Sequence, residues 1–383
     1  MNPILYVYPI WNTISFSLVA KKHVEYIKKL NLARVYEMDE LVFPNFSPSI
    51  RYDAVVHPFM FIWERVVSKV DKTTLPRLKH RVKQYVEGFK NQYDQVIAVD
   101  VCDSDRMSEY AVNLLNYADK VIVPSSFCVE VYKSSGVKKP VYRVPHGVDA
   151  EWYTTPNIWS TELREKVGSL VRAVYEYKVN KNKRILLFWL WHSPTRKGID
   201  EVLKVYTRLR KERSDVALVM KVASFSSFLV AHLSPDYPQK PEELDINFVI
   251  GWLSDFDKMA LYDLADITLM FSVGGGFEIS TLESLARGVP VVASNKGSWT
   301  DYVPEFLQAM AGDKVKVFDK HDIHIGYGYK VDVEDALNKI YDILDNYDEY
   351  KARTEEWRQK VLFNEFRWDL IAKKLVDIIT NSV

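Results

Sequence analysis

The stretch GGGFEISTLESLARGVPVVAS, from Gly274 to Ser294, constrains the fold more than any other part of the chain. An apolar run precedes its three glycines, a short helical pattern follows them, and a glycine and a proline lead into a second apolar run. This order predicts a strand, a glycine-rich loop, a helix and another strand. Because such a loop presents backbone N–H groups and a helix N-terminus, we expect an anion to bind there.

Two carboxylates flank the predicted loop, one from Glu278 and one from Glu283. Carboxylates accept hydrogen bonds from hydroxyl groups, so acids beside a phosphate site indicate sugar hydroxyls. A structural interpretation is also open, because Ser280 to Glu283 fits a capping box and the glycines fit a tight turn. The motif alone does not decide between the two.

The same segment resembles the donor-sugar motif of retaining family 4 glycosyltransferases of the GT-B fold. That motif reads E-G-F-G-x-x-x-x-E followed by A-x-G-x-P-V-V-A-S. Gly276 and Phe277 match its G-F pair, and Glu283 matches its second glutamate. The first glutamate falls on Gly275, which has no carboxylate, and Glu278 falls on the second glycine. We therefore expect Glu278 to reach the same sugar by another path.

Other segments resemble this family in the same order, from about residue 93 to the C-terminus. They are Ala118–Phe127 (A-D-x-V-x-x-P-S-x-F), Val144–Asp149 (I-P-N-G-V-D), Gly251–Ser254 with Leu261–Asp266, and Phe366–Asp369 with the helix after it. The resemblance implies an α/β protein of two Rossmann-like, doubly wound domains that face each other across a cleft.

The predicted domain boundaries follow from the same reading. The acceptor-binding domain would span 1–165, with a C-terminal helix at about 366–383 crossing back onto it, and the donor-binding domain would span 178–365. A polar stretch at about 160–183 marks the expected join. The alternation of strand and helix patterns in both halves separately predicts parallel sheets with helices on both faces.

Composition excludes several other classes of protein. The 383 residues are 48% hydrophobic and carry a formal net charge of zero, which fits two folded domains and argues against a general nucleic-acid binder. The two cysteines, Cys102 and Cys128, make no disulfide framework, which indicates a reducing interior. No apolar run is long enough to span a bilayer, so we expect a cytoplasmic protein.

The run Arg196-Lys197-Gly198 stands just before a predicted helix in the second half. By resemblance, the two cations clamp the donor diphosphate and stabilise the departing nucleotide. His192 stands where the family carries an arginine or lysine, and we expect it to be a weaker partner of the phosphates. A solvated basic turn is the alternative, although a cation at a helix start opposes the helix dipole.

Two segments of the first half are candidates for the acceptor side. Asp103 and Asp105 lie in a stretch that resembles W-E-T-D-R-L of some family members, where a carboxylate would orient the acceptor hydroxyl or take its proton. A D-x-D sequence also holds a metal in GT-A glycosyltransferases, and an Asx turn is equally open. His57 ends a strand that resembles the family's D-V-V-H, which opens on the cleft; a packed histidine is the alternative.

Residues 64–90 carry eight basic and three acidic side chains around one apolar stripe. A basic amphipathic helix can lie on an anionic membrane, which would place the protein at the inner face of the membrane. An ordinary surface helix whose stripe packs on the sheet is the favoured alternative.

The sequence therefore predicts a hexosyltransferase that moves a sugar from a UDP- or GDP-type donor to a hydroxyl of a glycan, lipid or protein. By resemblance the reaction retains anomeric configuration and needs no metal or other cofactor. Glu283 would hold the ribose, Glu278 the sugar, and Gly275 to Phe277 would offer backbone groups to the sugar and diphosphate.

Three alternatives stay open. One is an inverting transferase or an epimerase on the same fold. Another is a metal-dependent GT-A enzyme that uses Asp103 and Asp105. The third is a non-catalytic module that binds nucleotide sugars or glycans, which is motivated by Gly275 and His192 standing where the family carries functional side chains.

Overall fold

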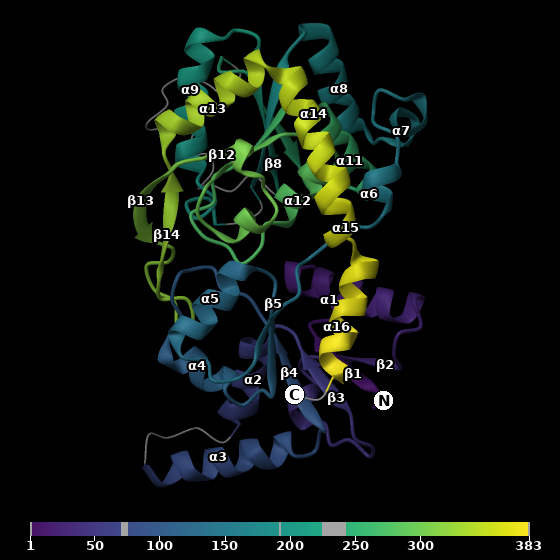
Figure 1. The fold of residues 1–383 in the computed structure, drawn as a ribbon, viewed down its shortest axis with the longest axis vertical. Helices are drawn as coiled ribbons and strands as arrows, with labels where there is room; N and C mark the ends of the chain where they lie inside the picture. The colour runs from purple at the N-terminus through teal and green to yellow at the C-terminus, as the bar shows by residue number, and fades with distance from the viewer. Residues whose placement is uncertain (1, 70–75, 191–192, 224–242, 382–383) are drawn as a thin grey trace. The chain divides into compact units, whose positions relative to one another are not determined.

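The computed structural model describes residues 2–69, 76–190, 193–223 and 243–381 (Figure 1). Its contacts divide the chain into two compact units. The first unit comprises Met1–Gly147, Phe318–Gly326 and Phe366–Val383, and the second comprises Val148–Val317 and Tyr327–Glu365. Each unit is built on one six-stranded parallel sheet, which confirms the predicted α/β class.

The sheet of the first unit has the strand order β2-β1-β3-β4-β5-β6, with every pair parallel. Its strands are β1 (Ile4–Tyr8), β2 (Val35–Asp39), β3 (Asp53–Val56), β4 (Gln95–Val99), β5 (Lys120–Val123) and β6 (Val141–Arg143). Its helices are α1 (Ser15–Lys29), the short η1 (Phe43–Asn45), α2 (Phe59–Ser68), α3 (Pro76–Lys90), α4 (Glu109–Leu115), α5 (Ser126–Ser135) and α16 (Trp368–Thr380). β1, β3 and β5 are buried along their whole length, and their residues are apolar except for Asp53 and Lys120, which begin β3 and β5.

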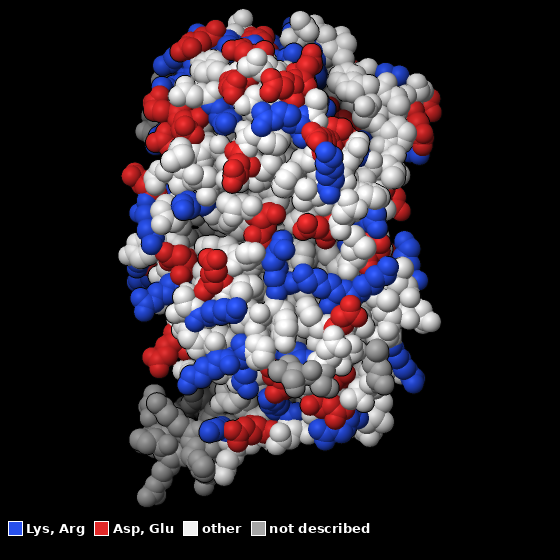
Figure 2. Space-filling view, viewed as in Figure 1, with Lys and Arg blue, Asp and Glu red and all other residues white. Residues whose placement is uncertain are grey.

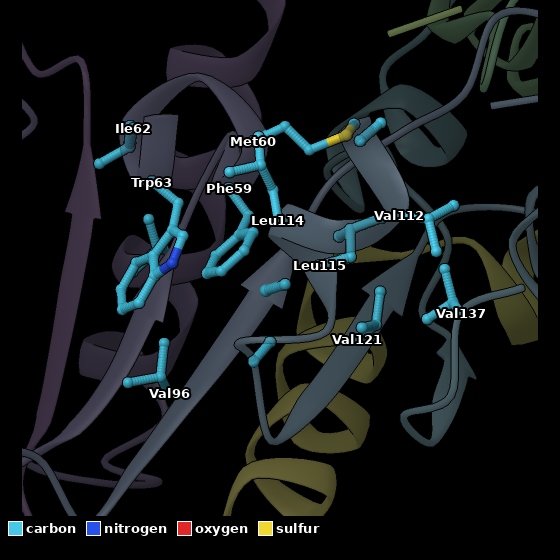
Figure 3. Close-up of a cluster of buried hydrophobic side chains, with 14 of the residues drawn as sticks. Phe59, Met60, Ile62, Trp63, Val96, Val112, Leu114, Leu115, Val121 and Val137 are labelled. Atoms are coloured by element: carbon cyan, nitrogen blue, oxygen red, sulfur yellow. The ribbon is translucent and has the colours of Figure 1, made fainter. Parts of the chain in front are cut away.

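Aromatic side chains of α2 form the centre of the core of the first unit. Figure 3 shows Phe59 and Trp63 side by side, with ring centroids 5.1 Å apart and nearly parallel planes. Leu114 and Leu115 of α4 and Val96 of β4 belong to the same buried cluster. The helical spacing of the apolar residues in α2 and α4 therefore places these helices on the sheet.

The sheet of the second unit has the strand order β12-β11-β10-β7-β8-β9 and is also parallel. Its strands are β7 (Arg184–Leu190), β8 (Val216–Val222), β9 (Ile246–Ile250), β10 (Ile267–Met270), β11 (Val291–Ser294) and β12 (Gln308–Ala309), and β13 (Ala311–Lys316) and β14 (Tyr327–Val331) form a separate antiparallel pair. Its α-helices are α6 (Glu151–Thr154), α7 (Thr161–Lys166), α8 (Ser169–Lys181), α9 (Ile199–Glu212), α11 (Asp255–Leu264), α12 (Ile279–Ala286), α13 (Val333–Asp345), α14 (Tyr347–Trp357) and α15 (Phe363–Glu365). Two short 3-10 helices, η2 (Ser298–Asp301) and η3 (Glu305–Leu307), and a π-helix, η4 (Arg358–Leu362), belong to the same unit. The polar stretch in which we expected the join forms α7 and α8 of this unit.

The segment Phe318–Gly326, between β13 and β14, belongs to the first unit. The backbone N–H of Ser108 donates to the Ile323 carbonyl at 2.9 Å, and the Gly326 N–H donates to the Ser104 hydroxyl at 3.2 Å. Ile323 is also part of the hydrophobic core of that unit. This segment thus contacts the residues just before α4 and packs into the core of the first unit, although it is distant from them in sequence.

Charged side chains of both signs are interspersed over the face of the molecule drawn in Figure 2. This mixture fits the formal net charge of zero. Many of the charges are paired; Arg208, for example, lies 2.7 Å from Glu334 on the surface of the second unit.

Candidate active site

The candidate site of the second unit lies where the strand order of its sheet reverses. β7 and β10 are paired in the middle of the sheet, but the chain continues from β7 to β8 on one side and from β10 to β11 on the other. In open α/β sheets, ligands bind at such a point, at the carboxyl ends of the strands. The loop after β7 carries Arg196 and Lys197, and the loop after β10 carries the three glycines and Glu278.

Lys197 and Glu278 form an ion pair between these two loops. Nζ of Lys197 lies 2.7 Å from Oε1 and 2.6 Å from Oε2 of Glu278. The side chains are only 17% and 7% exposed, so the two charges lie in a site that is largely removed from water. The guanidinium of Arg196 donates to the Gly274 carbonyl at 2.8 Å, which ties the basic turn to the glycine loop. The structure thus brings the adjacent Arg196 and Lys197 together with Gly274 and Glu278, which lie 78 and 81 residues further along the chain.

Gly198 permits the close approach of these loops. Its φ is +75°, in the left-handed region that favours glycine, and it is the N-cap residue of α9. A Cβ at this position would lie 2.1 Å from the carbonyl oxygen of Phe271. A side chain there would therefore push the N-terminus of α9 away from the end of β10.

The glycine loop is held in place by residues from η2 and its flank. The Tyr302 hydroxyl accepts from the Glu278 N–H at 3.1 Å and lies 3.0 Å from the Glu278 carbonyl, to which it donates. The rings of Phe277 and Tyr302 stack with centroids 4.7 Å apart, and Ser298 donates to the Gly275 carbonyl at 2.6 Å. Burial raises the pKa of Tyr302 well above its ordinary value, so the hydroxyl keeps the proton that it donates.

Glu283 lies on α12, and its carboxylate bonds to α11. Oε1 lies 3.0 Å from Nζ of Lys258, and Oε2 accepts from the Tyr262 hydroxyl at 3.0 Å. Burial alone would lower the pKa of Lys258. The neighbouring carboxylates of Glu283 and Asp255 raise it by a larger amount, so the pKa lies well above the ordinary value of a lysine. Lys258 therefore stays protonated and orients the carboxylate.

The capping-box interpretation of Glu283 is wrong. α12 begins at Ile279, its N-cap residue is Glu278, and no side chain caps it. Because the helix begins before Ser280, the hydroxyl of that residue is not at the position from which it could form the box.

The segment around Asp103 and Asp105 packs within the first unit. The Asp103 N–H donates to Nδ1 of His324 at 3.4 Å, and the Ser104 hydroxyl donates to the Arg106 carbonyl at 2.9 Å. Among the residues that the structure describes, no group of three or more histidine, cysteine, aspartate or glutamate side chains is arranged to hold a metal ion. The roles of both aspartates toward an acceptor stay predictions.

His57 is completely buried, in a cluster that the sequence did not reveal. The Tyr6 hydroxyl lies 2.7 Å from Nδ1 of His23 and 3.5 Å from Nδ1 of His57. His23 and His146 both lie against the ring of Trp368, with centroids 5.6 and 6.3 Å away. Burial lowers the pKa of all three histidines, to about 3 for His23 and His146. The predicted acceptor role of His57 stays a prediction.

Two further sequence predictions concern residues outside this geometry. His192, expected to assist the phosphate clamp, lies outside the described residues. In the region 64–90, Val86 and Phe89 of α3 are buried, and the ring of Phe89 meets Phe43 edge-on at 5.3 Å, which agrees with packing on the sheet. None of the helices in the described ranges has the length and apolarity needed to cross a bilayer. Membrane contact by this region stays a prediction.

Sequence reasoning missed several residues that shape the site, chiefly Lys258, Tyr262, Ser298 and Tyr302. Tyr262 stands in the segment Leu261–Asp266 that resembles the family, so its position was available as a signal. The other three make their contacts from elements whose packing the sequence pattern does not reveal.

Comparisons of the sequence with known proteins find related chains. Residues 175–315 match the family of glycosyl transferases group 1. The chain is 28% identical to an uncharacterized protein of Sulfolobus islandicus rod-shaped virus 1 over 98% of both chains. It is 24% identical to the lipopolysaccharide 1,2-N-acetylglucosaminetransferase of Salmonella typhimurium, over 68% of this chain and 62% of that one.

Solved structures show the same fold. The crystal structure of Anabaena HepE in complex with UDP-glucose superposes with a TM-score of 0.65 at 13% identity, covering 99% of this chain and all of the other. WaaG, a glycosyltransferase involved in lipopolysaccharide biosynthesis, gives 0.59 at 12% identity, covering 99% of this chain and 100% of the other.

The two parallel sheets, with the site at the switch point of the second sheet, have the fold of these GT-B glycosyltransferase structures. The chain resembles the glycosyl transferases of group 1, as its motifs indicated. It is therefore an enzyme of the class that takes its sugar from a nucleotide-sugar donor.

Proposed function

We propose that the second unit binds a nucleoside diphosphate hexose at the ends of β7 and β10, and that the chain transfers the hexose to an acceptor hydroxyl. The observation that carries this proposal is the meeting of cations and carboxylates at one glycine-rich loop. Lys197 and Arg196 lie against the loop that holds Glu278, and Glu283 stands on the helix that follows it. Phosphates bind cations and N–H groups, whereas sugar hydroxyls bind carboxylates, so a site with both fits a ligand with both.

Each side chain takes a role from its chemistry. Arg196 and Lys197 would hold the diphosphate, next to the N-terminus of α9 that begins after Gly198. Glu283, oriented by its bonds to α11, would accept hydrogen bonds from the ribose hydroxyls. Glu278 would face the hexose. Backbone groups of Gly275 to Phe277 would complete the contacts to the sugar and diphosphate.

The proposed transfer retains the anomeric configuration and needs no metal. The bond between the anomeric carbon and the phosphate oxygen breaks, and the acceptor oxygen bonds to the same carbon on the same face. The acceptor proton passes to the leaving phosphate oxygen, so no protein nucleophile is required. The two cations at the diphosphate stabilise the charge that develops on the leaving group.

The acceptor is proposed to be a hydroxyl of a glycan, a lipid or a protein. We assign its contacts to the first unit, with Asp103 as the candidate side chain, because His57 is completely buried. A UDP-linked donor is supported by the crystal structure of HepE in complex with UDP-glucose.

The test is a nucleotide screen that needs no known acceptor. Heat stability and slow donor hydrolysis are measured with UDP-glucose, UDP-N-acetylglucosamine, GDP-mannose and dTDP-glucose, with and without EDTA. A ligand present at 100 times its Kd stabilises the folded state by about 2.7 kcal/mol. We expect one nucleotide family to stabilise the wild type, EDTA to have no effect, and Glu283→Gln to abolish the shift. Glu334→Gln, which changes an exposed acid of the same unit, is the matched control.

The outcomes separate the remaining alternatives. No stabilisation by any of these donors contradicts the proposed donor site. Stabilisation without hydrolysis or transfer to any acceptor supports the non-catalytic binding module instead. A shift that disappears with EDTA contradicts the metal-free reaction and favours a metal-dependent site.

A further inference from the structure

Gly275 is a glycine for a reason other than its backbone conformation. Its φ is not in the left-handed region, so an ordinary residue could adopt this conformation. A Cβ at this position, however, would lie 2.6 Å from Oε1 of Glu278 and 3.6 Å from Nη1 of Arg196. Real Cβ atoms do not approach oxygen so closely, and the Glu278 carboxylate therefore occupies the space in which a side chain at 275 would begin.

The Glu278 carboxylate is held firmly in this space. Lys197 binds both of its oxygens, and Tyr302 binds both the N–H and the carbonyl of its backbone. The residue as a whole is only 5% exposed. A buried carboxylate is costly unless it is paired, so Lys197 is what allows an acid to stay at this place.

We propose that positions 275 and 278 have exchanged roles in this protein: Glu278 supplies the carboxylate that reads the hexose hydroxyls, and the glycine at 275 makes room for it. The inference rests on the proposed function, because it specifies which residue of the donor site contacts the sugar. An ionised carboxylate has about four acceptor positions, and the bonds to Lys197 occupy two of them. Both oxygens thus keep capacity to accept from hydroxyl groups of a hexose.

The ion pair gives this arrangement a further consequence for specificity. Lys197 carries the charge that attracts a diphosphate, and the carboxylate bound to it repels one. The carboxylate therefore weakens the binding of a nucleoside diphosphate alone to Lys197. A nucleoside diphosphate hexose offers hydroxyl groups to that acid as well, so the pair favours the intact donor over the free nucleotide.

The test compares the free nucleotide with the intact donor. Isothermal titration calorimetry gives the Kd of UDP and of UDP-glucose, and of GDP and GDP-mannose, and the pair that binds wild type is carried through all variants. The quantity of interest is the Kd of the free nucleotide divided by the Kd of the corresponding nucleotide sugar. We expect Glu278→Gln to lower this ratio about tenfold or more, because hydrogen bonds to a charged group are lost from the sugar only.

Two further variants keep the inference testable if Glu278→Gln folds poorly. Gly275→Ala leaves the acid in the sequence but forces its carboxylate aside, so we expect the ratio to fall. The exchange variant Gly275→Glu/Glu278→Gly returns an acid to the same space from position 275, and we expect it to recover at least a third of the wild-type ratio. Glu334→Gln, an exposed acid of α13, should keep the wild-type ratio.

The outcomes distinguish this inference from the proposed function. If wild type binds none of the nucleotides or their sugars, the proposed donor site fails and the inference with it. If wild type binds them, but Glu278→Gln changes both Kd values by the same factor and the exchange variant recovers nothing, Glu278 only neutralises Lys197. That result would overturn the inference and leave the donor site standing.

Discussion

Acidification should destabilise the first unit through its three buried histidines. His23, His57 and His146 lie around Tyr6 and Trp368. Burial holds the pKa of His23 and of His146 at about 3, compared with 6.5 for an ordinary histidine. The folded state therefore keeps these imidazoles neutral, whereas the unfolded chain protonates them at mildly acidic pH.

The magnitude follows from the difference between the two pKa values. Because the unfolded state binds more protons below pH 6.5, the free energy of unfolding falls as the pH drops from 6.5 toward 3. At pH 5 the unfolded histidine lies 1.5 pH units below its pKa of 6.5, and each unit is worth about 1.4 kcal/mol. Each of His23 and His146 thus contributes about 2 kcal/mol of destabilisation. The sum of about 4 kcal/mol is a large part of the 5–15 kcal/mol typical of a domain.

Urea unfolding at pH 7 and at pH 5 measures this effect. A brief hydrogen-exchange pulse at one fixed pH, read on peptides from β1 and α1, reports the unfolded fraction of the first unit alone. Between pH 7 and pH 5, the free energy of unfolding of the variant His23→Gln/His146→Asn should fall by about 4 kcal/mol less than that of wild type. His321→Gln, a half-buried histidine of the same unit outside the cluster, should lose as much as wild type. A wild type that loses less than about 1 kcal/mol, or a double variant that loses as much as wild type, would refute the reasoning.

Three further substitutions test the packing of the second unit by thermal and urea denaturation. Asp263→Ala should lower the free energy of unfolding by about 3–5 kcal/mol, because it leaves the buried guanidinium of Arg287 without the carboxylate that binds it at 2.9 and 2.8 Å. A loss below about 1 kcal/mol would contradict this. Gly198→Ala should lower the free energy of unfolding by at least about 2 kcal/mol and weaken nucleotide binding, because its Cβ would lie 2.1 Å from the carbonyl oxygen of Phe271. A variant as stable as wild type would show that α9 can move without penalty. Tyr302→Phe should lower the free energy of unfolding by about 1–3 kcal/mol, because the N–H and the carbonyl of Glu278 lose their buried partner. An unchanged free energy of unfolding would mean that water replaces the hydroxyl.

The elements around the glycine loop could be predicted from the sequence because their signals are local. The apolar run before Gly274 is β10, the helical pattern is α12, and the run after Pro290 is β11. Glycine and proline break the apolar periodicity at these points, so the order of strand, loop, helix and strand follows from the chain alone. The resemblance to the family then supplied the positions of the candidate donor residues.

The contacts within the site could not be predicted in the same way. Lys197 and Glu278 are 81 residues apart, and they meet because β10 pairs with β7 and not with β9, which precedes it in the sequence. No periodicity fixes that order of strands. The histidine cluster also escaped prediction, because His23, His57 and His146 come from three segments whose convergence requires the folded sheet and α16.

The residue missing from the motif has a different meaning once the side chains are placed. Judged from the sequence, Gly275 in place of a glutamate motivated the alternative of a non-catalytic module. In the structure, the volume beside that glycine is filled by a carboxylate that a lysine of the opposite loop binds through both oxygens. A catalytic site requires a charge at a point in space, and the chain can deliver it from either position. The absence of a motif residue is therefore evidence of lost function only when no neighbour occupies its place, and we propose that Glu278 occupies it here.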